Sequence, residues 1–209
     1  MKGGITTTEC DKWASQRGFS LVELIISTVI SLVILAAGVG VFTSALSTRT
    51  RESSKTDAIT SAQAALNIMS REIGNSGYGL TDNGIVTDST ANKLHFRANT
   101  VNSGNNNTTS DPGEDLVFYL DGSGANQSVV RRDNNTGEIS GIINRISSVN
   151  FSYYVTPGGS AVSAGSTVNI VTITLTVNLE NVQGQPSGQT VTVTSNVTLR
   201  NSPTMRGQY

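Results

Sequence analysis

The sequence predicts an α+β protein in which a long N-terminal α-helix packs on a C-terminal antiparallel β-sheet domain. Three observations support this fold class. Residues 19–42 are almost entirely apolar, small or hydroxylated, and apolar residues then recur every three or four positions to about Ile73. From about Gly79 the period changes to two, as expected for strands with one buried face. At 209 residues, the chain is long enough for one domain and an extension.

The composition argues against most enzymes and nucleic-acid binders. Charged residues make up 14% of the chain, aromatic residues 5%, and the formal net charge is -1. Such a chain, rich in Gly, Ser, Thr and Asn, is typical of a loop-rich extracellular β domain, and we expect no nucleic-acid partner. The single cysteine, Cys10, can form neither an internal disulfide nor a zinc site. The single histidine, His95, lies in an alternating segment that predicts a half-exposed strand residue, so we expect no enzyme and no cofactor.

The N-terminal segment separates charge sharply from hydrophobicity. Residues 1–18 are polar and include three basic residues, whereas Leu24 to Phe42 is a run of 19 residues without charge. As a helix this run would be about 28 Å long, close to the bilayer core of about 30 Å. The basic residues before it predict that the N-terminus stays cytoplasmic. A secretory signal cleaved after Ala37, a plain signal anchor and a signal cleaved before the apolar run all remain open at this point.

Glu23 favours cleavage before the run. It is the only charged residue between Phe19 and Phe42, and a carboxylate inside the membrane costs about 2.5–3.5 kcal/mol unless it finds a partner. The segment from Arg17 to Leu24, RGFSLVEL, resembles the cleavage site of the type IV pilin-like family. The resemblance implies a type IV pilin fold, a leader at residues 1–18, cleavage between Gly18 and Phe19 by the prepilin peptidase, and N-methylation of Phe19.

The residue types suit that chemistry. Gly18 lacks a side chain, so its backbone can approach a protease closely. Cleavage would leave a positive amine on Phe19, four residues from Glu23 and on the same face of a helix. The resemblance implies that Glu23 meets the Phe19 amine of a neighbouring subunit, which would offset the cost of burying the carboxylate.

The helical pattern continues beyond the membrane-length run. One apolar stripe predicts an amphipathic helix: Ile59, Ala62, Leu66, Met69 and Ile73. No proline precedes Pro112, and residues 74–77 supply stop signals. We therefore expect a transmembrane or filament-core helix at 19–42, its amphipathic second half at 43–76 and a globular domain at 77–209. A short coiled coil is the alternative for the stripe. Gly38 and Gly40 are interpreted equally well as bending points or as close-packing positions.

Period-two segments fill the C-terminal domain. The strand predictions are Lys93–Ala98, Asp115–Leu120, Ser128–Arg132, Ser148–Val155, Val168–Leu179 and Gln189–Leu199, with a weaker one at Ile142–Ile146. The two long segments that come last predict an antiparallel hairpin with one water-facing, Thr-rich face.

Acidic residues near glycine turns raise the alternative of calcium binding. The candidates are Asp111, Glu114, Asp115 and Asp121, although no full calcium-loop pattern is present. Apart from these weak candidates, the sequence predicts no metal site. The Arg131-Arg132 pair is interpreted as a solvated strand end.

The second half of the chain carries a less specific resemblance. Residues 65–79 (ALNIMSREIGNSGYG), 146–154 (ISSVNFSYY) and 197–201 (VTLRN) are similar to PilW-type minor pilins and J-type pseudopilins. Removal of the leader would leave 191 residues, which is long for a bulk pilus subunit. The resemblance implies a minor pilin that helps to initiate pilus assembly at or near the tip of an extracellular pilus. Alternatives are a minor pseudopilin of a type II secretion system, or a tip adhesin or DNA-uptake subunit.

The same resemblance implies a set of partners. These are the prepilin peptidase, other minor pilins, the major pilin, the inner-membrane assembly platform and, before assembly, membrane lipid. Many pilins close their C-terminal region with a disulfide, which this chain cannot do. Its C-terminal strands must therefore rely on sheet pairing and core packing.

Overall fold

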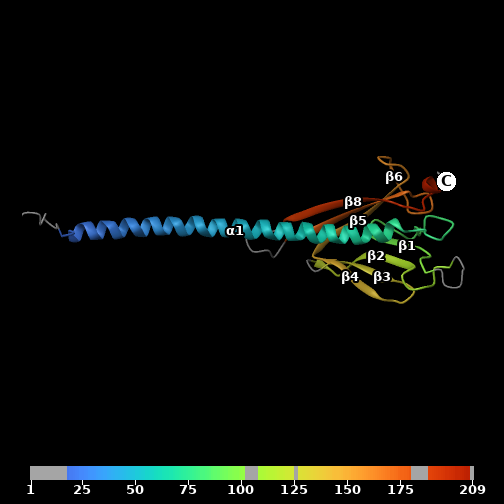
Figure 1. Ribbon diagram of the computed structural model, residues 1–209, viewed down its shortest axis with the longest axis horizontal. Coiled ribbons are helices and arrows are strands. Elements are labelled where there is room, and N and C mark those ends of the chain that lie inside the picture. The colour runs from blue at the N-terminus through green and yellow to red at the C-terminus, as the bar shows by residue number, and fades with distance from the viewer. Residues whose placement is uncertain (1–17, 102–107, 125–126, 180–187, 208–209) are drawn as a thin grey trace, which may run out of the picture. The chain divides into compact units, whose positions relative to one another are not determined.

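A computed structural model describes residues 18–101, 108–124, 127–179 and 188–207 (Figure 1). The predicted leader, except Gly18, and with it Cys10, lies outside the described residues. The chain forms two compact units, Met1–Leu46 and Ser47–Tyr209. The second unit contains the C-terminal half of the long helix together with all the described strands.

The first element is helix α1 (Leu21–Gly74), which has 54 residues. It begins two residues after Phe19, where the sequence predicted the start of the helix. Its length follows from the absence of proline and from the many residues with good helix propensity. The predicted stop signals are confirmed. Gly77 adopts φ 77°, and a Cβ atom there would lie 2.5 Å from the carbonyl oxygen of Asp82. Only glycine fits a backbone that turns this tightly with positive φ.

The described residues that follow form eight strands, arranged as two antiparallel four-stranded sheets. Sheet A has the order β1 (Lys93–Arg97), β2 (Asp115–Asp121), β3 (Ser128–Asp133), β4 (Ile139–Asn144). Sheet B has the order β6 (Ala161–Val162), β5 (Ile146–Tyr154), β7 (Ile170–Asn178), β8 (Thr190–Thr198). A short helix, α2 (Pro203–Arg206), follows β8. The α+β prediction is confirmed.

The six main strand predictions agree with the structure to within two residues, but the weaker prediction at Ile142–Ile146 is wrong in its bounds. This stretch contains the end of β4 and the first residue of β5, separated by Arg145 at φ 57°. A non-glycine residue in the left-handed region is uncommon and breaks the regular path of a strand. The chain therefore leaves sheet A and enters sheet B at Arg145. The sequence did not predict β6 or α2.

The predicted C-terminal hairpin is confirmed. Strands β7 and β8 pair over their whole length, from Ile170 opposite Thr198 to Asn178 opposite Thr190. On the solvent face, hydroxyls meet across the two strands: Thr174 Oγ1 lies 3.3 Å from Thr194 Oγ1. Valine, isoleucine and leucine alternate with these threonines on β7 and point into the core.

The apolar stripe of α1 lies in the core of the second unit. Ala62, Leu66, Met69 and Ile73 are all less than 5% exposed and pack with buried residues from both sheets. Figure 1 shows this half of α1 running alongside the strands of the same unit. The coiled-coil alternative is therefore wrong, because the stripe is covered by the chain's own β domain.

Polar side chains help to hold the C-terminal segment, where no disulfide is available. Asn201 Nδ2 donates to the carbonyl oxygens of Gly77, Leu80 and Asp82, in the turn after α1. The backbone N–H of Arg200 also donates to the carbonyl oxygen of Gly74, at the last residue of the helix. These bonds connect the end of the chain to the exit of α1, in addition to the predicted sheet pairing and core packing.

The opposite faces of α1 give a direct stability prediction. Met69→Ala should lower the free energy of unfolding by about 2–5 kcal/mol, because it leaves a cavity in the core. Ile68→Ala should change it by less than about 0.5 kcal/mol, because Ile68 is 45% exposed. Urea unfolding of the detergent-solubilised chain, followed by near-ultraviolet circular dichroism, measures both. Equal effects of the two substitutions would contradict this placement of the stripe.

Candidate functional site

The predicted cleavage site lies where the described chain enters α1. Gly18 and Phe19 precede the helix, and the side chain of Phe19 is 78% exposed. Apart from its chain neighbours, no described residue lies within 4 Å of a Cβ atom placed at Gly18. The Gly18–Phe19 peptide bond thus has the accessibility that a protease needs, since an uncovered backbone can enter an active site.

Glu23 occupies the first turn of α1 and is exposed. A carboxylate there interacts favourably with the partial positive charge at the helix N-terminus. Its side chain has no hydrogen-bond or ion-pair partner among the residues that the structure describes in this single chain. The helix position therefore leaves the carboxylate available to another molecule.

Three hydroxyl side chains in the apolar half of α1 bond within the helix. Ser27 Oγ donates to the carbonyl oxygen of Glu23 at 2.8 Å, and Thr28 Oγ1 donates to that of Ile25 at 2.8 Å. Thr43 Oγ1 donates to the carbonyl oxygen of Val39 at 3.0 Å. Hydroxyls that bond back to their own helix cost little in a hydrocarbon environment. Glu23 differs from these residues because it is the only charged side chain of residues 19–42, and a charge in hydrocarbon is costly without a partner.

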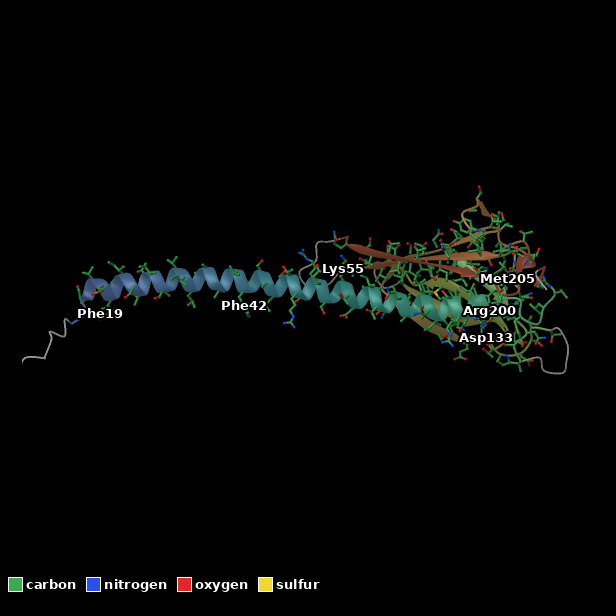
Figure 2. All side chains as sticks on the ribbon, turned by 45° about the horizontal axis from the view of Figure 1, so that its top comes forward. Phe19, Phe42, Lys55, Asp133, Arg200 and Met205 are labelled. Carbon is green, nitrogen blue, oxygen red and sulfur yellow. The ribbon has the colours of Figure 1, made fainter. Side chains whose placement is uncertain are left out.

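The first half of α1 exposes apolar side chains all around its circumference, as Figure 2 shows between Phe19 and Phe42. Its length and composition allow it to cross a membrane. The helix continues without a break through Gly38 and Gly40. Apart from the adjacent residues and helix backbone, no described residue lies within 4 Å of a Cβ atom placed at either glycine. Neither glycine is therefore a point of unwinding in this chain, and both present open backbone surface.

Comparison with known proteins agrees with this arrangement. Residues 13–39 match the family model of the prokaryotic N-terminal methylation motif. The match includes Gly18, Phe19 and Glu23 and the first part of α1, and it is consistent with the type IV pilin-like prepilin family. No curated protein and no solved structure matches the chain.

The methylation motif indicates the class of protein to which the chain is similar. Proteins that carry it are structural subunits, and it supports a pilin or pseudopilin subunit here. The long apolar helix followed by an antiparallel β domain is the architecture expected for such a subunit.

A second group of polar residues lies on the face of sheet A that points away from the core. His95 belongs to this group, and the prediction that it is a half-exposed strand residue is wrong. The residue is only 7% exposed rather than half-exposed. Its Nδ1 lies 2.7 Å from Asp88 Oδ1, and its Nε2 lies 2.7 Å from Asp115 Oδ1. The alternation in β1 correctly placed Lys93, His95 and Arg97 on one face, but the pairing with Asp115 depends on the register between β1 and β2.

Asp115 is the centre of this group. Arg97 Nε donates to its Oδ2 at 2.7 Å, and Asn134 Nδ2 donates to its Oδ1 at 2.7 Å. Burial alone would raise the pKa of the Asp115 carboxyl. The hydrogen bonds from Asn134, His95 and Arg97, together with the charge of His95, outweigh burial and hold this pKa below its usual range. The pKa of Asp88 is also lowered, because bonds to Lys93 and His95 outweigh its desolvation.

The structure does not bring the calcium candidates together as a site. Glu114 is buried and its carboxylate accepts the backbone N–H groups of Val101 and Asp111. Asp115 belongs to the group around His95, and Asp121 is exposed at the far end of β2. Within the described ranges, no group of three acidic, histidine or cysteine residues could hold a metal ion.

The two neighbouring arginines of β3 lie on opposite faces of sheet A. Arg131 turns toward α1, where its Nε donates to Glu72 Oε2 at 2.9 Å. Arg132 is exposed on the outer face, in register with Val117. The prediction of a solvated strand end therefore describes Arg132 and is wrong for Arg131.

The lowered pKa of Asp115 predicts an acid-dependent loss of stability. A depressed carboxyl pKa stabilises the fold above the unfolded value near 3.8, and this contribution is lost as the pH falls through the lower folded value. Asp115→Asn should cost about 1–3 kcal/mol at pH 7 and make the loss of stability below pH 4 shallower. Thermal unfolding between pH 2 and 7 measures both effects. The exposed Asp121→Asn is the control, and an identical pH profile for the two variants would contradict the role of Asp115.

Proposed function

We propose that this chain is a minor pilin of a type IV pilus, a low-abundance subunit that helps to initiate assembly and lies at or near the tip. One observation supports the proposal above the others. The Gly18–Phe19 junction of the methylation motif directly precedes an apolar helix whose membrane-length part contains one charged side chain, Glu23, which has no partner among the described residues. A carboxylate placed in this way is suited to pairing between subunits.

Maturation begins at the junction. The prepilin peptidase cleaves between Gly18 and Phe19 and releases the basic leader. The new amine of Phe19 is then methylated and stays positively charged. It lies four residues before Glu23 in the sequence and just outside the N-terminus of α1, so charges of opposite sign lie at the same end of the helix.

Assembly then transfers the apolar half of α1 from lipid to other subunits. Both environments are apolar, so the transfer requires little change in the burial of its side chains. The carboxylate of Glu23 is different, because it is costly in hydrocarbon unless a positive group meets it. Pairing with the Phe19 amine of a neighbouring pilin removes that cost and sets the axial register. The partners are the major pilin, other minor pilins and the inner-membrane assembly platform.

Before assembly, α1 holds the subunit in the inner membrane with the N-terminus in the cytoplasm. The basic residues of the leader favour this orientation. The β domain then folds in the periplasm. Its abundance of Ser, Thr and Asn suits an exposed position on a filament.

A minor pseudopilin of a type II secretion system is the second candidate. The methylation motif fits it equally well, and the helix exit at residues 65–79 is similar in both groups. The size of the mature chain favours a minor subunit in either system. Co-purification with sheared pili, as opposed to co-purification with secretion-system subunits, distinguishes the two. A DNA-uptake subunit is less favoured, since Arg131 is engaged by Glu72 and contributes no free charge to a basic patch.

The processing step makes the first prediction from this proposal. Intact-mass analysis of the membrane-extracted protein should show a chain that begins at methylated Phe19. In cells without the prepilin peptidase, the mass should be that of the uncleaved chain. Gly18→Leu should have the same effect in normal cells, because a bulky side chain obstructs the approach of the protease. A chain that begins near Gly38 would indicate a secretory signal and overturn the proposal.

The pairing step makes a separate prediction. Glu23→Gln should be cleaved normally but should be reduced at least tenfold in sheared pili, because the neutral amide cannot compensate the Phe19 amine. Immunoblots of membrane and sheared fractions give the ratio. Glu52→Gln, an exposed acidic residue farther along α1, is the matched control and should enter pili normally. Equal incorporation of both variants would eliminate the role given to Glu23.

A further inference from the structure

The outer face of sheet A carries a pocket that pilus assembly does not explain. Strands β1, β2 and β3 bring His95, Val117 and Arg132 into one row across the sheet, and Lys93 lies opposite Tyr119 in a parallel row. These side chains, together with Asp88 and Asn134, line a pocket of about 350 Å³. The buried Val117, 7% exposed, contributes an apolar surface to it.

The acidic groups near this pocket are already neutralised. Asp88 accepts from Lys93 Nζ at 2.7 Å and faces His95 Nδ1 at the same distance. Asp115, behind the pocket, has bonds to Asn134 and Arg97 and faces the other nitrogen of His95. Neither carboxylate is therefore free to neutralise an additional cation.

Arg132 lines the same pocket and adds a positive charge that neither carboxylate neutralises. Its exposed guanidinium makes no hydrogen bond or ion pair to any other residue in the described ranges, and the same is true of the Tyr119 hydroxyl. A guanidinium binds a carboxylate through two parallel N–H groups. The pocket thus combines an unpaired cation, a free phenol and a partly apolar wall.

We propose that this pocket binds a carboxylate-bearing sugar unit, such as a uronic acid of an acidic polysaccharide, with its carboxylate on Arg132. The volume is at the small end of the range for ligand pockets and fits a group the size of one hexose. One free arginine matches one carboxylate, whereas a nucleic acid would need several cations along its phosphates. Tyr119 adds a hydroxyl and an aromatic ring, which suit a sugar ring with polar groups and an apolar face.

A peptide ligand fits this surface less well. Peptides commonly bind a sheet by adding a strand to its open edge. The β1 edge is already covered in part, because Val86 N–H donates to the His95 carbonyl oxygen and Arg97 N–H donates to that of Gly84. Ser89 Oγ accepts the His95 N–H at 2.9 Å. The unsatisfied donors near the pocket therefore belong to side chains, as in sugar recognition.

The test is a binding titration on the detergent-solubilised full chain. Galacturonate and its trimer are compared with galactose and with a neutral peptide that ends in a free carboxylate, using saturation-transfer NMR and calorimetry. The expected result is binding of the galacturonates at least tenfold tighter than that of galactose. Arg132→Gln should weaken this binding about tenfold or more, because a hydrogen bond to a charged group is lost. Tyr119→Phe should weaken it several-fold without removing it.

Arg131→Gln is the matched control, because Arg131 is the next residue of β3 and bonds to Glu72 on the opposite face. It should leave the affinity for galacturonate unchanged. Circular dichroism of each variant establishes whether it is folded. If Arg132→Gln does not fold, the galacturonate affinity of Tyr119→Phe tests the pocket instead. The proposal is overturned by equal affinity for galactose, by tighter binding of the peptide, by no galacturonate binding at 20 mM, or by equal effects of the two arginine substitutions. Each of these outcomes is independent of pilus assembly, because the measurement uses the isolated protein.

Discussion

The burial of one face of α1 against both sheets is the interaction on which the rest of the β domain depends. Sheets A and B contribute to a single core, and the stripe from Ala62 to Ile73 lies within that core. Without the helix, each sheet would expose an apolar face that the other sheet alone does not cover. The same continuous helix also contains the apolar segment with Glu23. One element therefore combines a second half buried in the β-domain core with a first half whose apolar side chains are exposed.

The two faces of sheet A have different roles because strand alternation separates their residues. Leu94 and Phe96 of β1 enter the core, where Phe96 stacks on Phe118 with ring centroids 5.6 Å apart. The intervening His95 contributes to a network of charged groups on the other face. A buried histidine between two carboxylates is costly unless every donor and acceptor is satisfied. Here Asp88 in the turn before β1 and Asp115 of β2 supply those partners, which fixes the side chains beneath the pocket. Arg132 has no partner among the described residues.

The functional features of the chain differ in what they require from the fold. The Gly18–Phe19 junction and Glu23 need only an accessible helix N-terminus, and they depend on a local stretch of sequence. The pocket on sheet A requires three strands in the correct register, because its residues come from positions 88 to 134. The first kind of site tolerates large changes in the β domain, whereas the second is lost with a one-residue shift in strand pairing.

The sequence by itself determined the long helix, its apolar and amphipathic halves, the six main strands and the methylation motif. Each of these depends on local periodicity or on a short motif, which are readable without knowledge of the fold. Tertiary structure alone decided that the stripe is covered by the chain's own sheets, that Arg145 divides β4 from β5, and that His95 is buried between Asp88 and Asp115. Those outcomes depend on strand order and register, which bring together residues that are distant in sequence and leave no local pattern.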